Sequence, residues 1–259
     1  MNTIKDTIKL NKQNTLMIAH AGLEGFETPN TLAGVVAAGN RSYWGIEVDV
    51  RVTKDKEIVL IHDDNLFESV GVDVKVSEHT WAELQQYTRY DRREFFGMEQ
   101  YGLVDEKGIT RSDLRISSFG EYIRICKKYG KVAVPEIKGR FTPEAIEIML
   151  NVARQQDYLD HVVFISFGWE NLAEIRRQQP DQTVQFLTHA GMDTSDEFLD
   201  RVAAAGFDLD VHLSNVTEDL VKRCHARDIK LNVWTVDFLA DADRYVEWGV
   251  DYITSHILE

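Results

Sequence analysis

Apolar and polar residues alternate strictly over residues 44–52. Ile46, Val48, Val50 and Val52 are separated by Glu47, Asp49 and Arg51. Side chains of a β-strand alternate between its two faces, so this pattern predicts a strand with every polar side chain on one face. The two carboxylates would therefore point the same way. A surface strand with one solvent-exposed face would show the same alternation.

A second apolar run, residues 58–61, ends abruptly in His62-Asp63-Asp64. Only residues 53–56 separate the two runs, which is too short for a parallel crossover, so we predict an antiparallel hairpin. In that hairpin His62 returns level with Val48 and Asp49. A histidine and two carboxylates would then share a small volume, although a surface hairpin with scattered charges remains the simpler alternative.

The chain after residue 118 alternates regularly between helix and strand patterns. Strands are predicted at 15–19, 44–52, 131–138, 161–166, 183–188, 207–211, 229–236 and 250–254, with 57–62 as the return arm of the hairpin. Helices are predicted at 118–129, 143–156, 169–179, 195–205, 218–227 and 240–248, and an earlier one is capped near Thr28, has Pro29 in its first turn and ends near Gly39. Eight parallel strands with covering helices predict a (βα)₈ TIM barrel.

A doubly wound open sheet is the alternative fold, but the first strand is followed by His20-Ala-Gly-Leu-Glu-Gly rather than a glycine-rich dinucleotide fingerprint. We expect one domain over residues 1–259. Residues 65–118 lack the barrel rhythm and predict an insertion at the barrel rim, either a lid or binding loop or a solvated loop with its own small core.

Composition narrows the choice of partner. Against 29 Lys and Arg stand 43 Asp and Glu, a formal net charge of −14, which disfavours nucleic acid and anionic membranes as partners. Cys126 and Cys224 fall in helical patterns and are expected to be reduced structural thiols. No apolar run has the length of a signal peptide or a membrane span, so we expect a cytoplasmic protein.

Residues at the carboxyl ends of barrel strands converge on one site. Those positions hold His20, Glu47, Asp49, His62, Glu136, Lys138, Trp234 and Asp237. Carboxylates suit Mg²⁺ or Ca²⁺, with Mn²⁺ as a further candidate, and two histidines suit removal and delivery of a proton. Each residue alone is an ordinary rim residue, so the combination carries the prediction. Of the other histidines, His79, His161, His189, His225 and His256 are interpreted as surface or hydrogen-bonded structural residues, and His212 is left open.

The chain resembles the glycerophosphodiester phosphodiesterase family in motif order and spacing. The motifs are His20-x-Gly, Asn30-Thr-Leu, Ile46-Glu-x-Asp-Val, Thr53-Lys-Asp, His62-Asp with Leu66, Glu136-Ile-Lys, Ser166-Phe, Val233-Trp-Thr-Val and Gly249-Val-Asp-Tyr-Ile-Thr. The resemblance implies a divalent cation held by Glu47, Asp49 and Glu136, catalytic His20 and His62, Lys138 on the phosphate side and Trp234 lining the substrate pocket.

The resemblance implies hydrolysis of a small phosphodiester to an alcohol and a phosphomonoester. We assign proton removal from the attacking oxygen to His20 and protonation of the departing alkoxide to His62. The attacking oxygen is water or a neighbouring hydroxyl of the substrate, which would give a cyclic phosphate first.

Two positions depart from the family pattern. Ala21 replaces an arginine and Pro29 replaces a glutamate. A bidentate phosphate grip is thereby lost, for which Arg89, Arg92 or Arg93 are hypothetical substitutes.

Three functions stay open from the sequence. The first is the metal-dependent phosphodiesterase. The second is a non-catalytic member that binds a phosphodiester or sugar phosphate, which the loss of the arginine favours. The third is a barrel enzyme acting on a sugar acid or enolate with Lys138 as base, which would require a depressed pKa of Lys138 and a His20 turned away from the metal.

Overall fold

A closed ring of parallel strands forms the centre of the protein. The computed structural model describes residues 6–89 and 114–259, and in that part of the chain eight strands pair in parallel around the ring. β1 pairs with β10 on one side and β2 on the other, which closes the barrel. The strands are β1 (Leu16–Ala19), β2 (Gly45–Val52), β5 (Val132–Ile137), β6 (Phe164–Ser166), β7 (Val184–Thr188), β8 (Asp208–His212), β9 (Leu231–Trp234) and β10 (Tyr252–Ser255). The predicted TIM barrel is confirmed, and the open-sheet alternative is wrong.

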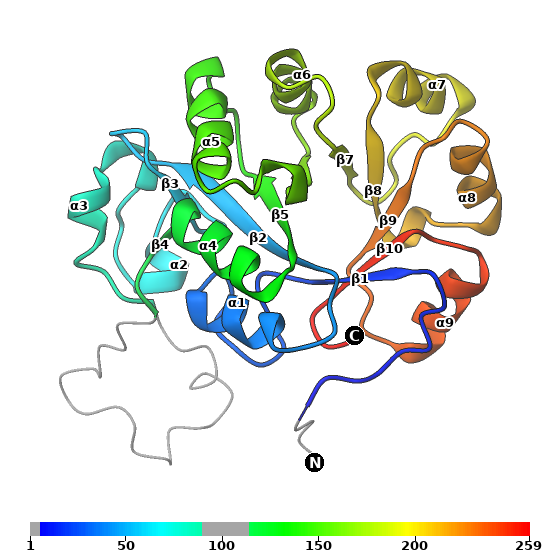
Figure 1. Ribbon diagram of the computed structural model, residues 1–259, viewed down its shortest axis with the longest axis horizontal. Helices are drawn as coiled ribbons and strands as arrows, with labels where there is room; N and C mark the ends of the chain where they lie inside the picture. The colour runs from blue at the N-terminus through cyan, green and yellow to red at the C-terminus, as the bar shows by residue number, and fades with distance from the viewer. Residues whose placement is uncertain (1–5, 90–113) are drawn as a thin grey trace.

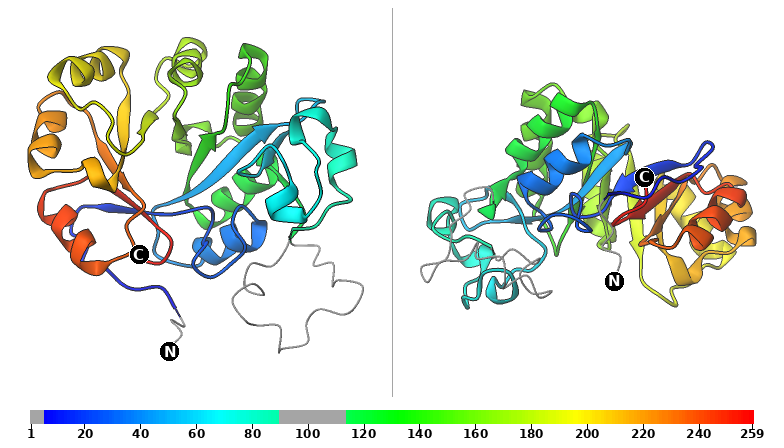
Figure 2. Two further views of the ribbon diagram at one scale, coloured as in Figure 1. Left: turned by 180° about the vertical axis from the view of Figure 1, so that it is seen from behind. Right: turned by 90° about the horizontal axis from the view of Figure 1, so that it is seen from below.

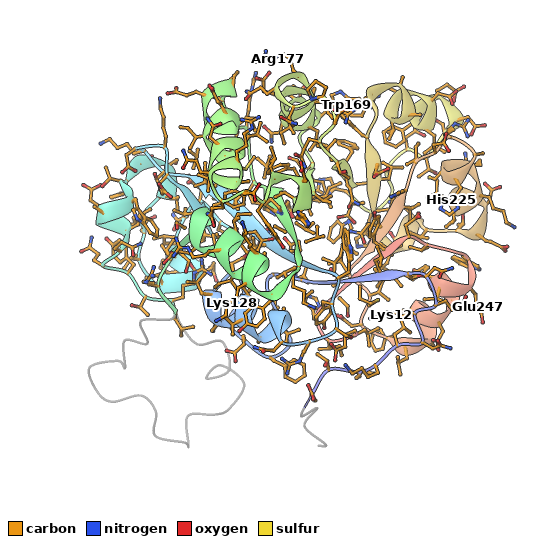
Figure 3. The ribbon with its side chains drawn as sticks, viewed as in Figure 1. Lys12, Lys128, Trp169, Arg177, His225 and Glu247 are labelled. Carbon is orange, nitrogen blue, oxygen red and sulfur yellow. The ribbon has the colours of Figure 1, made fainter. Side chains whose placement is uncertain are left out.

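Helices cover the outside of this ring and follow one another around it (Figures 1 and 2). They are α1 (Leu32–Gly39), α4 (Phe119–Tyr129), α5 (Pro143–Gln155), α6 (Trp169–Gln178), α7 (Asp196–Ala205), α8 (Glu218–His225) and α9 (Leu239–Glu247), with the 3₁₀ turns η5 (Leu159–His161) and η6 (Leu213–Asn215). Long charged side chains such as Arg177 and Glu247 project from the outer faces (Figure 3). Within the described ranges, none of the helices combines the length and apolarity needed to cross a bilayer.

The helices begin and end where local chemistry dictates. In α4, Ser118 and Glu121 form a reciprocal capping box that satisfies backbone N–H groups of the first turn. At the other end Gly130 adopts a left-handed conformation, φ +63°, that costs glycine least. Between these caps α4 buries Phe119, Tyr122, Ile123 and Cys126 against the strands. Cys126 and Cys224 are both buried free thiols.

The hairpin that begins with β2 forms as predicted. β3 (Ile58–Leu60) runs antiparallel to β2, with Val50 opposite Leu60, and the Ile61 N–H donates to the Asp49 carbonyl at 3.0 Å. β5 occupies one edge of β2 along residues 45–50, so β1 and β3 share the other edge, β1 at its start and β3 at its end. His20 and His62 therefore both arrive near the level of Glu47 and Asp49.

The segment between β3 and β4 (Ser117–Ser118) contains α2 (Phe67–Val70), the turn η1 (Val76–Glu78) and α3 (Trp81–Leu84). These short elements pack on a small core of their own, formed by Val59, Ile61, Leu66, Val70, Val76, Leu84 and Ile116. Arg92 and Arg93, two of the hypothetical phosphate contacts, lie outside the described residues.

The predicted start of the first helix is wrong. α1 begins at Leu32, and its N-cap is Thr31, whose hydroxyl accepts from the Gly34 N–H at 3.2 Å. Pro29 precedes the helix because Asn30 has φ +58°, a left-handed conformation that no helix can pass through. The sequence contains a threonine that can cap a helix, but it does not show the turn at Asn30. That turn forms because the Asn30 side chain is hydrogen-bonded to Asp49.

The interior of the barrel is divided in composition. Ile18, Val134, Val163, Ile165, Leu187 and Tyr252 form an apolar cluster inside the ring. Gln185, Asp210, Asn232 and Thr254 are polar and also buried. Asn232 and Thr254 hydrogen bond to each other, with Asn232 Nδ2 at 3.1 Å from Thr254 Oγ1. Burial, and then the nearby charge of Glu136, raises the pKa of Asp210 well above its usual range.

The burial of Asp208, at the start of β8, predicts how the free energy of unfolding depends on pH. Burial raises its pKa from 3.8 to about 6, although its Oδ1 accepts the Lys230 N–H at 2.9 Å. A carboxyl whose pKa rises on folding contributes stability that is fully present below the unfolded pKa and is lost as the pH rises through the folded one. Asp208→Asn keeps the acceptor, so we expect it to raise the free energy of unfolding by about 2 kcal/mol at pH 8 and by almost nothing near pH 4.

Urea unfolding at the two pH values measures this difference. Asp243→Asn on the exposed face of α9 is the matched control, because no comparable burial acts on Asp243. Equal effects of Asp208→Asn at both pH values would contradict the expectation.

Candidate active site

Three carboxylates meet inside the barrel mouth. Glu47 and Asp49 of β2 face the interior of the barrel because the alternating residues Ile46 and Val48 pack into the outer core beneath the helices. Asp49 is level with Glu136 of the neighbouring strand β5. One oxygen of each carboxylate lies within 4.8 Å of the others, and all three residues are buried. The structure thus brings together the predicted metal ligands.

Two backbone segments hold these acids in place. The Asn30 side chain donates from Nδ2 to Asp49 Oδ2 at 2.7 Å and accepts the Asp49 N–H at 2.7 Å. The Ala21 N–H donates to Glu47 Oε2 at 2.6 Å, and Ala21 has φ +48°. The loop after β1 and the loop before α1 therefore orient the carboxylates, which explains why Asn30 belongs to the site although it bears no charge.

The charge balance of the cluster fits a divalent cation. Burial, and then the negative charge of Asp49, raises the pKa of both Glu47 and Glu136. Lys138 Nζ lies 2.8 Å from Glu136 Oε1 and 3.4 Å from Asp49 Oδ1. Three buried carboxylates against one ammonium leave an excess of negative charge that a hard, oxygen-preferring cation would neutralise.

Lys138 is a cation at this site and is unsuited to act as a base. Burial opposes its charge, but Asp49 and Glu136 outweigh burial and raise the pKa of the ammonium above its usual value. The enolate hypothesis required a depressed pKa of Lys138. The structure argues against that hypothesis.

His20 faces the acids with one ring nitrogen. Its Nε2 lies 4.0 Å from Glu47 Oε2, and its Nδ1 lies 3.0 Å from Glu24 Oε2. A carboxylate that accepts from Nδ1–H leaves Nε2 as the lone-pair nitrogen. The Nε2 of His20 therefore faces the carboxylate cluster, whereas the enolate hypothesis required His20 to turn away from the metal.

His62 lies at the rim of the same mouth. Its side chain is 59% exposed, and its Nδ1 lies 2.8 Å from Asp63 Oδ1. Its carbonyl accepts from Arg51 Nε at 2.7 Å, so the last interior-facing residue of β2 fixes the backbone at His62. The rim position therefore leaves the imidazole of His62 accessible to solvent.

Arg89 does not provide the phosphate grip that we considered for it. The guanidinium is buried and its Nη1 donates to the carbonyls of Pro29 and Asn30, at 2.6 and 2.9 Å, while Nη2 donates to the carbonyl of Leu60. Arg89 thus ties the loop before α1 to β3. Ala21 is itself buried, and its backbone serves Glu47.

Aromatic side chains line the opposite strand ends. The rings of Phe167 and His189 stack with centroids 4.0 Å apart, and Trp234 meets Phe167 and His212 edge-on at 5.8 and 5.2 Å. The indole N–H of Trp234 is buried and has no hydrogen-bond partner among the described residues. A pocket of about 310 Å³ lies beside Glu136 and Lys138 and is lined also by Ile137, Gly139, Arg140, Phe167, Gly168, Glu170 and Asn171.

Sequence reasoning missed several residues of this mouth. Glu24, Arg140 and the aromatic contacts of His189 were not identified, and His256 was interpreted as structural. His256 Nδ1 lies 2.6 Å from Asp237 Oδ2, and its Nε2 lies 3.4 Å from Glu24 Oε2. The position of His256 in the sequence could have identified it, because His256 directly follows β10, as His20 directly follows β1.

Comparisons with known proteins agree with this geometry. Residues 20–258 match the Glycerophosphoryl diester phosphodiesterase family. A glycerophosphodiester phosphodiesterase of Caldanaerobacter subterraneus subsp. tengcongensis is 26% identical over 241 residues, which cover 92% of this chain and 93% of the relative. A glycerophosphodiester phosphodiesterase of Bacillus altitudinis is 25% identical, covering 92% of this chain and 93% of its own.

A solved structure supports the fold as well. An Oleispira antarctica phosphodiesterase, in complex with its product sn-glycerol-3-phosphate, superposes with a TM-score of 0.79 at 22% identity and covers 96% of both chains. At that identity the likeness speaks for the fold alone. The family match over nearly the whole chain is what decides the assignment, and this protein therefore belongs to the glycerophosphoryl diester phosphodiesterase family.

Proposed function

We propose that this chain hydrolyses glycerophosphodiesters to an alcohol and a phosphomonoester in a reaction that depends on a divalent cation. The supporting observation is the meeting of Glu47, Asp49 and Glu136 beneath the Nε2 of His20. The family match supplies the reaction class, and the geometry supplies the assignment of roles.

The three carboxylates are the proposed ligands of Mg²⁺, Ca²⁺ or Mn²⁺. When bound there, the cation supplies positive charge against the charge that develops on the phosphoryl group. Lys138 adds a second fixed positive charge at the same end of the pocket. The same residues that raise its pKa keep it protonated, so it can attract the substrate phosphate at neutral pH.

The two histidines are the proposed proton carriers. His20 accepts the proton of the attacking oxygen at Nε2. Glu24 accepts a hydrogen bond from Nδ1–H and so stabilises the imidazolium that forms. His62 donates a proton to the departing alkoxide, and Asp63 Oδ1, 2.8 Å from His62 Nδ1, orients the ring for that transfer. The alcohol group then leaves through the exposed rim.

The glycerol portion of the substrate, which stays on the phosphomonoester, is expected to occupy the pocket beside Lys138. Phe167 offers an apolar face there and meets Trp234 edge-on, while Arg140 adds a positive charge to the lining. A small polar alcohol such as glycerol fits this mixture better than a long acyl chain, because the pocket holds only about 310 Å³.

The decisive experiment uses chelator-stripped protein with glycerophosphocholine, glycerophosphoethanolamine and bis(p-nitrophenyl) phosphate. Each is incubated with and without Mg²⁺, Ca²⁺ or Mn²⁺, and products are followed by ³¹P NMR, which also reveals any cyclic phosphate. A His20→Asn, His62→Asn double variant purified in parallel controls for contaminating phosphatase. Cation-dependent product formed by the wild-type chain alone supports the proposal.

A non-catalytic, ligand-binding member of the family is the second candidate. Ala21 favours it, because no arginine stands directly after the first histidine and Arg89 is committed to backbone carbonyls. In the experiment above it predicts saturable binding of glycerophosphocholine, measured by calorimetry, without product under any of the three cations. That outcome would replace the hydrolase proposal.

Arg140 offers a test of substrate recognition. It follows β5 and lines the pocket beside Lys138. A hydrogen bond to a charged group is worth about 1.5–3 kcal/mol, so we expect Arg140→Ala to raise KM about 10-fold or more for glycerophosphodiesters with little change in kcat. Steady-state kinetics of Arg140→Ala and of a control variant measure KM and kcat. Arg124→Ala on the exposed side of α4 is the control, and an unchanged KM in Arg140→Ala would exclude Arg140 from the binding site.

A further inference from the structure

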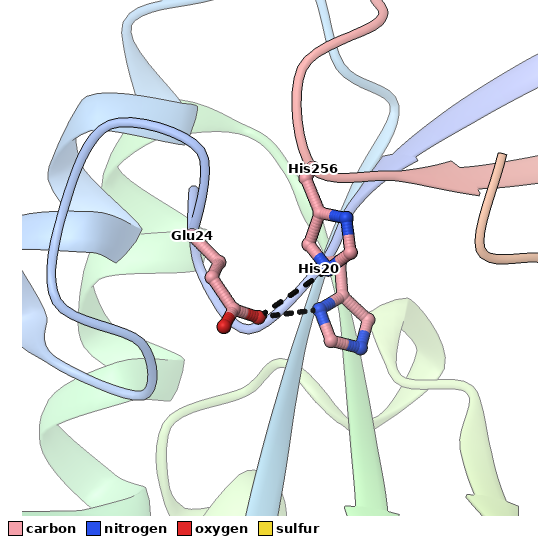
Figure 4. A group of neighbouring side chains, drawn as sticks. All are labelled: His20, Glu24 and His256. Atoms are coloured by element: carbon pink, nitrogen blue, oxygen red, sulfur yellow. Dashed lines mark hydrogen bonds and ion pairs between the residues drawn. The ribbon is translucent and has the colours of Figure 1, made fainter. Parts of the chain in front are cut away.

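A second cluster of potential ligands lies beside the carboxylates. His20 Nδ1, Glu24 Oε2 and His256 Nε2 come from the loop after β1 and the loop after β10, and these atoms lie within 4.8 Å of one another. Figure 4 shows both imidazoles directed at the same carboxylate oxygen. The cluster exists because Ala19 and Ser255 are paired in the barrel ring, which places His20 and His256 at adjacent strand ends.

We propose that His20, Glu24 and His256 form a binding site for a borderline divalent cation such as Zn²⁺, distinct from the carboxylate site. Two nitrogen ligands and one carboxylate are a donor set typical of zinc, whereas the neighbouring cluster offers oxygen alone. The two sites therefore differ in the metal that they select.

The spacing of the three atoms suits a tetrahedral ion. With metal–ligand distances of about 2.0–2.1 Å, ligand atoms in such a site lie about 3.3 Å apart. Here Glu24 Oε2 lies 3.0 Å from His20 Nδ1 and 3.4 Å from His256 Nε2. Two of the three ligand separations therefore match such a site and the third is at most 4.8 Å, while solvent can supply the fourth ligand because the three side chains are each 25–30% exposed.

Asp237 provides the outer support that metal-binding histidines usually have. Its Oδ2 lies 2.6 Å from His256 Nδ1, and its Oδ1 accepts the His256 N–H at 2.9 Å. A histidine that donates from Nδ1 to a carboxylate presents Nε2 to a metal in a fixed orientation. Ser255 Oγ donates to the same Asp237 at 3.0 Å, so the supporting carboxylate is itself held in place.

Occupancy of this site would affect the reaction. An ion on His20 Nδ1 replaces the proton there, so the proton of the neutral ring moves to Nε2, the nitrogen that faces Glu47. His20 then lacks the lone pair that a base requires. Zinc is accordingly expected to inhibit turnover; this consequence rests on the proposed function, but the binding of the metal does not.

Cobalt titration tests binding without reference to activity. Chelator-stripped protein is titrated with Co²⁺ in a large excess of Mg²⁺, which fills the carboxylate site, and the visible absorption of Co²⁺ is recorded. We expect a single Co²⁺ per chain with nitrogen ligands, displaced by Zn²⁺, and an affinity at least about 100-fold lower in His256→Asn and in Glu24→Gln. Circular dichroism checks that both variants fold, and the near-isosteric Glu24→Gln remains decisive if His256→Asn does not.

Two variants serve as controls. His225→Asn removes a similar imidazole–carboxylate pair, with Nε2 2.9 Å from Asp251 Oδ2, on α8 away from the mouth (Figure 3), and should bind Co²⁺ as the wild type does. Glu47→Gln, which alters the carboxylate site, should also retain the Co²⁺ spectrum. Absence of Co²⁺ binding by the wild type under excess Mg²⁺, or unchanged affinity in Glu24→Gln, would overturn the proposal, whether or not the protein proves to be a hydrolase.

Discussion

Substitution of His62 by asparagine is expected to lower kcat about 10²- to 10⁴-fold on glycerophosphocholine, because a general acid contributes about that much when the leaving group is an alkoxide. The same change should have little effect on bis(p-nitrophenyl) phosphate, whose nitrophenolate leaves without protonation. The ratio of the two losses, from steady-state kinetics at saturating Mg²⁺, is the measured quantity.

This dependence on leaving group separates the role of His62 from general damage to the site. His20→Asn is the comparison, because a base that activates the attacking oxygen should be needed for both substrates. His79→Asn, at a half-buried position after η1, controls for substitution of a histidine away from the site. Equal losses of His62→Asn on both substrates would show that His62 is not the acid.

Glu47→Gln is expected to reduce turnover while stabilising the metal-free protein. Charge stabilisation by a bound cation is worth several kcal/mol, which corresponds to a loss of about 10³-fold or more in turnover. The glutamine still accepts the Ala21 N–H but removes a buried negative charge beside Asp49 and Glu136. We expect the free energy of unfolding without metal to rise by about 2 kcal/mol at pH 8.

The sign of the stability effect follows from the pKa of Glu47, which burial and Asp49 raise well above its usual value. Stability from such a group is fully present below pH 4.5 and is lost as the pH rises through the folded pKa, so the charged cluster destabilises the metal-free protein at neutral and alkaline pH. Urea unfolding with chelator measures the free energy of unfolding of the metal-free protein, and urea unfolding with saturating Mg²⁺ measures that of the metal-bound protein. Glu147→Gln, exposed on α5, is the control, and lower stability of metal-free Glu47→Gln than of the wild type would contradict the account.

Both predictions rest on positions that could be read from the sequence. The alternation around Glu47 and Asp49 fixed the face on which their side chains lie, and the short turn after Val52 required the hairpin that returns His62 to them. These are local relations of period and chain length. The barrel brings Glu136 level with Asp49 because parallel strand ends meet at one edge.

The residues that sequence reasoning missed depend on contacts between distant parts of the chain. Glu24 lies four residues after His20, but it meets His256 only because β1 pairs with β10, and no local pattern records that pairing. Thr31 and Thr28 are equally good caps by residue type, and only the bond from Asn30 to Asp49 selects the later one. Arg89 was one of three hypothetical phosphate contacts, named for its charge, whereas its guanidinium is buried and donates to backbone carbonyls.

The antiparallel pairing of β3 with the second half of β2 affects how members of this family can diverge in sequence. β3 and β4 lie outside the ring of eight parallel strands, and the described residues between them, 61–89 and 114–116, contribute none of those strands. Residues can therefore be added or removed there without shifting the register of Glu47, Asp49 or Glu136. Evolution can alter what approaches His62 from the rim while leaving the three carboxylates at the floor of the barrel mouth unchanged.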